Sequence, residues 1–157
     1  MPGSDAIRSR EGSRGLFTGA PLDDATSFLL ARANARSLAL GNAALAPLGL
    51  KVRSYSVLAL AAEDERPSQR DLASFLRLDP SQVVSLVDDL ETRGLVERVP
   101  DPGDRRANAV VATPAGMRLA AEARAVLSDA DRFVFEGLDE DERAALATLL
   151  RRVAFWD

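Results

Sequence analysis

The chain has 157 residues and a net charge of −4, and 46% of its residues are hydrophobic and 28% charged. This is the composition of a globular protein with a real core, and no global basic field indicates nucleic acid. Cysteine and histidine are absent, which excludes disulfides, thiol redox sensing, Cys/His zinc sites and histidine catalysis. No segment has the pattern of a signal peptide or a membrane span, so we expect a cytoplasmic protein with no membrane partner.

The N-terminal part of the chain is predicted to be a tail followed by two helices. Residues 1–21 are rich in Gly, Ser, Arg and Pro and lack apolar periodicity, which predicts a flexible tail. Over residues 23–46, small apolar side chains recur at steps of three and four, as on one face of a helix. A second helix is predicted over residues 54–63, with Ser54 as its cap.

Two short helices joined by a tight turn are predicted next. Ser68 and Asp71 form a capping box at the start of the first helix. Asp79 caps the second helix, Pro80 takes its first position, and Gln82 completes an Asp-x-x-Gln box. The apolar stripe of this second helix comprises Val83, Leu86, Val87 and Leu90.

The C-terminal part is predicted to be a hairpin and two helices. Residues 95–99 and 108–113 have strand-like composition and flank a turn rich in Pro, Asp and Gly. Thr113 caps a long helix that reaches about Phe135, and Asp139 opens a last helix. The apolar seam of the last helix comprises Leu146, Leu149, Leu150 and Val153.

The order of these elements predicts a mainly α (α+β) fold, in which a helix-turn-helix is followed by a β-hairpin wing. In the second helix of the pair, short and amide-bearing side chains lie off the apolar stripe near the N-terminus. Gln82 can pair with adenine, and Val84 can contact a thymine methyl group. A solvated helix face is the alternative, but the wing that follows favours DNA. The candidate base-reading residues are Ser81, Gln82, Val84 and Ser85.

The predicted tip of the wing contains Asp104, Arg105 and Arg106. One arginine can enter a narrow minor groove, where the potential is most negative, and Asp104 can orient it. The alternative is a hairpin tip whose charges only solvate it.

The stretch 80–119 resembles the core of the MarR family of bacterial regulators, through its segments LVDDLETRGLVER and DRRA and the Thr113-x-x-Gly116 helix start. The resemblance covers roughly residues 24–156. It implies an obligate homodimer that binds double-stranded DNA at a pseudo-palindromic operator, with half-sites about 10 bp apart. It also implies that Ser68 and Gln69 contact phosphate. The candidate residues of the second helix would then read bases, and those at the wing tip would bind in the minor groove.

The resemblance further implies a division of the chain. Residues 22–50 and 114–157 would form the dimerisation region, and residues 51–113 the winged helix-turn-helix. The family often responds to small aromatic or carboxylate effectors, which predicts a repressor relieved by such a ligand. Leu38, Tyr55 and Met117 are candidate ligand-binding residues, although such apolar residues more often belong to the core.

One departure from the family pattern is electrostatic. Many relatives have a basic residue in the recognition helix, whereas residues 80–92 contain none and include Asp88 and Asp89. A winged helix that binds protein instead of DNA is therefore the alternative function. The sequence does not favour an enzyme, because phosphate loops, nucleophile motifs and metal-ligand clusters are missing, and we expect no cofactor. The acidic run at 139–142 is interpreted as helix capping and not as a metal site.

Overall fold

The computed structural model describes Leu22, residues 24–100 and residues 108–156. The chain divides into two compact units, residues 1–37 and residues 38–157. Within the described part of the chain, no helix is both long enough and apolar enough to cross a lipid bilayer.

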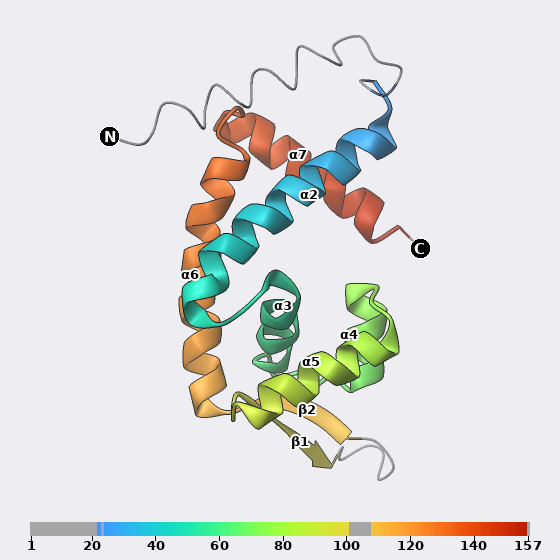
Figure 1. The fold of residues 1–157 in the computed structure, drawn as a ribbon. Helices are drawn as coiled ribbons and strands as arrows, with labels where there is room; N and C mark the ends of the chain where they lie inside the picture. The colour runs from blue at the N-terminus through green and yellow to red at the C-terminus, as the bar shows by residue number, and fades with distance from the viewer. Residues whose placement is uncertain (1–21, 23, 101–107, 157) are drawn as a thin grey trace, which may run out of the picture. The chain divides into compact units, whose positions relative to one another are not determined.

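The element order agrees with the prediction, and the boundaries differ from the predicted ones by three residues or fewer. Among the described residues, a β-hairpin interrupts the series of helices between residues 92 and 114, as Figure 1 shows. In chain order the elements are α2 (Thr26–Leu45), the 3-10 helix η1 (Ala46–Leu48), α3 (Val52–Ala61), α4 (Gln69–Leu76), α5 (Pro80–Thr92), β1 (Val96–Pro100), β2 (Asn108–Ala112), α6 (Pro114–Val134) and α7 (Glu140–Ala154).

Side-chain caps define the starts of four helices as the sequence predicts. Ser68, Asp79, Thr113 and Asp139 are the N-caps of α4, α5, α6 and α7, and each side chain accepts a hydrogen bond from a backbone N–H of the first turn. These bonds satisfy amide groups that have no partner inside the helix. The predicted cap of α3 is wrong, because Ser54 lies inside the helix and accepts a hydrogen bond from the N–H of Lys51, the actual N-cap, at 2.9 Å.

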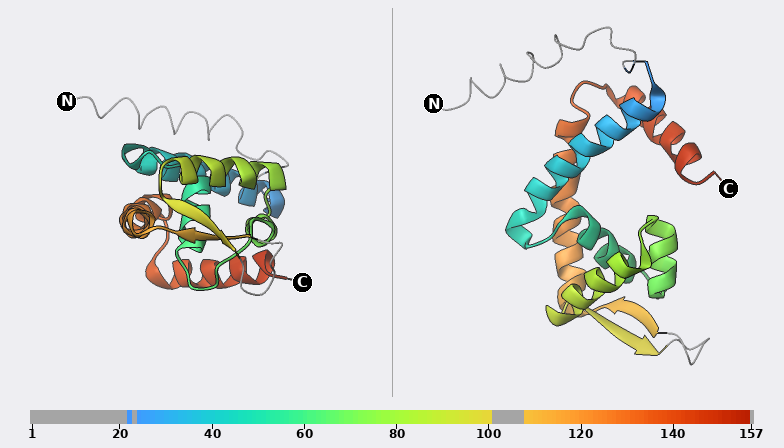
Figure 2. Two further views of the ribbon diagram at one scale, coloured as in Figure 1. Left: turned by 90° about the horizontal axis from the view of Figure 1, so that it is seen from below. Right: turned by 45° about the vertical axis from the view of Figure 1, so that its right-hand side comes forward.

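The hydrophobic core lies in the second unit. It is formed by α3, α4, α5, the hairpin and the first half of α6, with α3 packed against both α5 and α6. Figures 1 and 2 both show α5 lying beside the hairpin. Burial of these aliphatic side chains is the main stabilising term of the fold. The largest side chains of the core that are essentially inaccessible to solvent are Leu45, Val57, Leu58, Leu72, Val83, Val87, Leu90, Val96 and Val110.

The two strands form an antiparallel hairpin, with Val96 opposite Ala112 and Pro100 opposite Asn108. The hairpin is tied to the start of α4, because the N–H of Val110 donates to the carbonyl oxygen of Pro67 at 2.8 Å. The hairpin follows α5 directly along the chain, and this hydrogen bond attaches it to the segment that precedes α4.

The helices at the two ends of the chain bury little surface. In the second unit, α7 has no buried residue, and Phe133 on α6 is 64% exposed. In the first unit, Leu29 and Leu30 on α2 are also exposed. Large exposed apolar patches on helices are typical of surfaces that bind another chain.

Candidate nucleic-acid interface

A three-residue turn joins α4 to α5. Arg77 adopts the left-handed conformation (φ 50°) that ends α4, and its N–H donates to the carbonyl oxygens of Ala73 and Ser74. The N–H of Leu78 donates to the carbonyl oxygen of Ala73 at 3.1 Å and closes the turn. A left-handed non-glycine residue costs about 1 kcal/mol, so surrounding contacts impose this sharp change of direction. The predicted helix-turn-helix is present.

The start of α5 is held by a carboxylate. Asp79 Oδ1 accepts a hydrogen bond from the Ser81 hydroxyl at 2.5 Å and another from the Ser81 N–H at 2.8 Å. These two bonds hold the pKa of Asp79 below its ordinary value. The main donor to the cap is thus Ser81, and the predicted Asp-x-x-Gln box, with the Gln82 side chain bonded back to Asp79, does not form. Because the Ser81 hydroxyl already donates its proton to Asp79, it could act toward a base edge only as a hydrogen-bond acceptor.

The exposed side of α5 brings the candidate base-reading residues together. While Val83 and Val87 are fully buried, the side chain of Val84 is 41% exposed. The Ser85 hydroxyl donates to the carbonyl oxygen of Ser81 at 3.1 Å. Within the described part of the chain, no side-chain hydrogen bond engages the exposed amide of Gln82. A free amide beside an exposed methyl pair can read the edge of an A·T base pair.

The two predicted phosphate-contacting residues at the start of α4 differ in whether they have a free hydrogen-bond donor. The Ser68 hydroxyl donates to Asp71 Oδ2 at 2.6 Å and accepts from the Asp71 N–H at 3.2 Å. The bonds from the Ser68 hydroxyl and N–H lower the pKa of Asp71. Ser68 therefore has no free donor for a phosphate oxygen in this geometry. Gln69 keeps one, because Arg98 Nε donates to its Oε1 at 2.8 Å and its NH2 group stays available.

Arg98 on β1 connects the hairpin to both helices of the helix-turn-helix. Its Nη2 lies 2.5 Å from Asp88 Oδ1, its Nη1 pairs with Glu91 Oε2, and its backbone N–H donates to Glu91 Oε1 at 3.2 Å. With the bond to Gln69, three elements meet at one guanidinium. We call Arg98, Asp88, Glu91 and Gln69 the Arg98 cluster.

The negative charge of the helix-turn-helix is engaged within the protein. Arg93, at the end of α5, lies 3.5 Å from Asp89 and also donates to the carbonyl oxygen of Gly49 at 2.9 Å. Arg98 pairs with two further carboxylates, and serine side chains bind the remaining two. Each carboxylate therefore has a donor within the protein, and the three acidic side chains of α5 are paired with two arginines. The five carboxylates of residues 68–93 are Asp71, Asp79, Asp88, Asp89 and Glu91.

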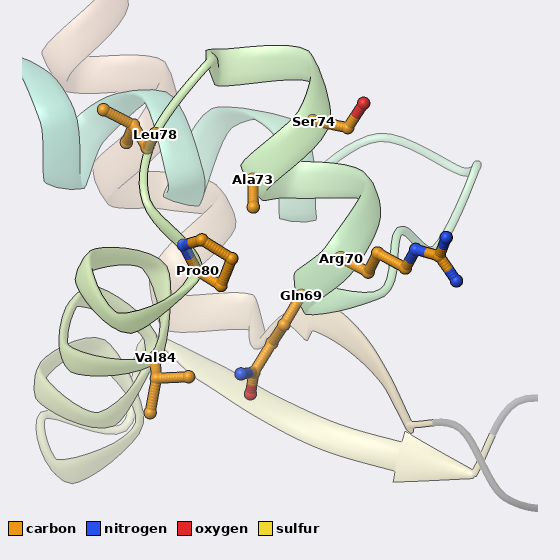
Figure 3. Close-up of a pocket in the computed structure, with 7 residues that line it drawn as sticks. All are labelled: Gln69, Arg70, Ala73, Ser74, Leu78, Pro80 and Val84. Atoms are coloured by element: carbon orange, nitrogen blue, oxygen red, sulfur yellow. The ribbon is translucent and has the colours of Figure 1, made fainter.

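An open hollow of about 390 Å³ lies between α4 and the start of α5. Figure 3 shows Gln69 and Val84 pointing toward one another across it, while Arg70 points away. Its wall is mostly apolar, with polar groups at the rim. The hollow therefore lies between a predicted phosphate-contacting residue, Gln69 on α4, and a predicted base-reading residue, Val84 on α5. The lining residues are Gln69, Arg70, Ala73, Ser74, Leu78, Pro80 and Val84.

The predicted wing tip lies outside the described residues. Asp104, Arg105 and Arg106 belong to residues 101–107, between the paired strand ends Pro100 and Asn108. Their role in groove binding stays a prediction.

The candidate effector residues also stay a prediction. Tyr55 is partly buried against the core, and Met117 is 52% exposed on α6. The hollow described above is lined by other residues. Among the described residues, no three acidic side chains gather into a group that could hold a metal ion.

Sequence reasoning missed Arg93 and Arg98. The strand pattern contains a signal for Arg98, because side chains alternate between the two faces of a strand. Val96 is buried, Glu97 is exposed and Arg98 is half-buried, so Arg98 lies on the inward side of β1. An inward-facing arginine directly after an acidic helix indicates an internal ion pair.

Comparison with known proteins identifies the family. The profile of the MarR family matches residues 48–107. The crystal structure of a MarR-family transcriptional regulator from Rhodococcus sp. RHA1 is 44% identical, with a TM-score of 0.82 over 87% of this chain and 96% of that one. CouR from Rhodococcus jostii RHA1, crystallised with p-coumaroyl-CoA, is 44% identical, with a TM-score of 0.79 over 88% of this chain and 97% of CouR.

A curated relative gives the same indication. A Thauera aromatica protein, described as a transcriptional regulatory protein for the hcr operon, is 32% identical over 99 residues. The match spans 63% of this chain and 60% of that relative, which is less than two thirds of its length.

A helix-turn-helix followed at once by a hairpin defines the winged helix-turn-helix class of regulators. Within that class, the chain belongs to the MarR family of transcriptional regulators.

Proposed function

We propose that the chain binds a pseudo-palindromic DNA operator as a homodimer and thereby represses transcription. Each α5 would enter a major groove, and each wing would reach the adjacent minor groove. The main observation in support is the exposed arc of α5, where Gln82, Val84 and Ser85 lie together while the carboxylates of the helix-turn-helix are engaged internally. The function requires no catalytic step, and we place it in the cytoplasm with the genomic DNA.

Dimerisation is supported by the terminal helices. On α7, Leu149 and Val153 are 56% and 68% exposed, and Trp156 just beyond the helix is 75% exposed. An amphipathic helix without a buried residue is unstable alone, so a second copy of the chain is the partner that we propose. In this arrangement residues 22–50 and 114–157 form the dimerisation region, and residues 51–113 bind DNA.

For the effector, we propose an aromatic acid or its coenzyme A thioester. The 44% identical CouR was crystallised with p-coumaroyl-CoA, which joins a phenolic acyl group to a nucleotide. A ligand relieves repression only if it binds one dimer conformation more tightly than the other. Titration of the protein–DNA complex with p-coumaroyl-CoA, p-coumarate and coenzyme A separates the three chemistries. Release by none of them would remove this ligand class from the proposal.

The experiment that tests DNA binding is selection from a random-sequence duplex pool, followed by measurement of Kd over a salt series. We expect an inverted repeat with half-sites about 10 bp apart. We also expect log K to fall linearly with log salt, by about 0.9 for each phosphate contact. A winged helix that binds protein would enrich no sequence and would show little duplex affinity even at low salt.

Two kinds of variant distinguish base reading from groove binding. Gln82→Ala should relax selection at one operator position while nonspecific affinity stays near that of the native protein. Arg105→Ala or Arg106→Ala should weaken operator binding by about 1–3 kcal/mol if that side chain enters the minor groove. Equal losses on all sequences for Gln82→Ala would contradict its base-reading role.

A further inference from the structure

The C-terminal half of α5 carries negative charge on the face that would meet DNA. Asp88 follows Ser81 and Ser85 at helical spacing, so the three share one side of the helix. Glu91 extends this side by one further turn. A free carboxylate at these positions would repel the phosphates of the groove walls. DNA binding through α5 therefore requires that this negative charge be offset at least in part.

The guanidinium of Arg98 pairs with both carboxylates, and its single positive charge offsets one of the two negative charges. Nη2 is used by Asp88, Nη1 by Glu91 and Nε by Gln69. The Arg98 side chain is 23% exposed, whereas those of Asp88 and Glu91 are 58% and 40% exposed. Arg98 is thus less exposed than the two carboxylates that it pairs with, and each of its three nitrogens already donates within the protein.

We propose that Arg98 is a positioning residue for DNA binding, which acts through Asp88, Glu91 and Gln69 without contacting DNA itself. It offsets part of the charge of α5 and fixes the angle between α5 and the wing strand. The inference rests on the proposed function, since it assigns a role within the same interface.

The same contact sets the orientation of the Gln69 amide. Because Nε of Arg98 is a donor, Oε1 of Gln69 must be the atom that faces it. The NH2 end then faces away from Arg98, at the rim of the hollow shown in Figure 3. A phosphate oxygen is an acceptor and can bind only that end. Arg98 thereby holds the Gln69 amide with its NH2 group free to donate to a phosphate oxygen.

The cluster keeps its charge at neutral pH. Burial by itself lowers the pKa of Arg98, but the hydrogen bond with Asp88 and the charges of Glu91 and Asp88 outweigh it, and the pKa is raised. The guanidinium that faces the two carboxylates is therefore charged at neutral pH.

The test is a set of variants measured on one selected operator duplex. Arg98→Gln removes the charge and the fork, and Arg98→Lys keeps the charge but loses the fork geometry. We expect Arg98→Gln to raise Kd by about 10- to 50-fold, because two carboxylates lose the one cation that they share, and Arg98→Lys to give a smaller rise. Arg124→Gln, at an exposed position on α6, makes the same change in net charge away from the Arg98 cluster and serves as the control, once light scattering shows that this variant is still a dimer. Thermal unfolding of each variant accompanies the binding data.

A rescue experiment separates positioning from direct contact. Asp88→Asn together with Glu91→Gln should improve binding much more in the Arg98→Gln background than in the native background, where both carboxylates are already paired. Equal improvement in the two backgrounds would mean that Arg98 contacts DNA on its own account, and would overturn the proposal. Equal losses for Arg98→Gln and Arg124→Gln would also overturn it, because net charge alone would then explain the result.

The two proposals fail in different ways. If the native protein binds no duplex at low salt, the proposed function is wrong. If the native protein binds but Arg98→Gln binds equally well, the proposed function stands and only the role of Arg98 is lost.

Discussion

Helices α5 and α7 have the same kind of apolar pattern but opposite burial. In α5, Val83, Val87 and Leu90 are completely inaccessible to solvent. In α7, Leu149 and Val153 occupy equivalent stripe positions and are 56% and 68% exposed. The periodicity of a sequence thus shows that a helix face will be buried, but not whether the same chain buries it.

The apolar face of α5 contributes to folding of the single chain, whereas that of α7 is available for assembly with a second chain. The core around the winged helix-turn-helix is completed within the same chain, and it includes Leu45 of α2 and Ala120 and Ala123 of α6, which lie outside residues 51–113. The terminal helix has a capping box and a cationic last turn that specify it locally, but none of its residues is buried. We therefore expect substitutions in α5 and α7 to affect different measurements.

The largest effect is expected from charge on the apolar face of α7. Leu149→Glu with Val153→Glu would place two carboxylates in the proposed dimer interface, where an unpaired buried charge costs several kcal/mol. The variant should be a monomer by light scattering and should lose operator binding, because one winged domain cannot span two half-sites. A variant that stays dimeric would place the interface elsewhere.

The next effect is expected from the core of α5. Leu90→Ala should lower the free energy of unfolding by about 2–5 kcal/mol, as is typical of a fully buried leucine. The measurement is chemical denaturation at two protein concentrations, and the loss should appear at both. If Leu90→Ala instead changed only the oligomeric state, the division between the two helices would be wrong.

A smaller effect is expected at the junction of the wing and α6. A Cβ at Gly116 would lie 1.9 Å from the carbonyl oxygen of Leu95, which is backbone and cannot move freely. Gly116→Ala should therefore destabilise the protein by about 1–3 kcal/mol. Gly137→Ala, whose Cβ would have no neighbour within 4 Å, is the matched control. Equal melting temperatures for the two variants would show that the junction tolerates a shift.

The smallest effect is expected from acid. The pKa values of Asp71 and Asp79 are lowered from 3.8 in the folded protein by the cap bonds from Ser68 and Ser81. A lowered folded pKa contributes stability above pH 3.8 that is lost as the pH falls through the folded values. Asp71→Asn with Asp79→Asn should flatten this acid branch of a stability–pH profile measured by denaturation. An unchanged acid branch would show that other carboxylates control it.

Local chemistry explains why most of the fold was predictable. Helix starts depend on residues within one turn, so Ser68, Asp79, Thr113 and Asp139 could be identified without tertiary information. The start of α3 was misplaced because Ser54 is as suitable at the third helical position as at the cap. Gly94 follows the last turn of α5 with a positive φ (68°), a conformation that often ends a helix and that glycine adopts without strain.

The site was less predictable because its key contacts are not local. Arg98 meets partners that lie 7, 10 and 29 positions away along the chain, and they converge only when the hairpin packs on α5. From sequence, Asp88 therefore appeared as a free anion that opposed DNA binding. The structure changes that interpretation, because the carboxylate is paired.

The mass of the complex with one selected operator duplex tests the central claim most directly. Sedimentation equilibrium of the full chain, with and without the duplex, gives the number of chains in each species. We predict two chains alone and two chains on one duplex. A monomer in solution, or a single chain bound to the duplex, would contradict an account in which α7 joins two copies so that two α5 helices reach successive grooves.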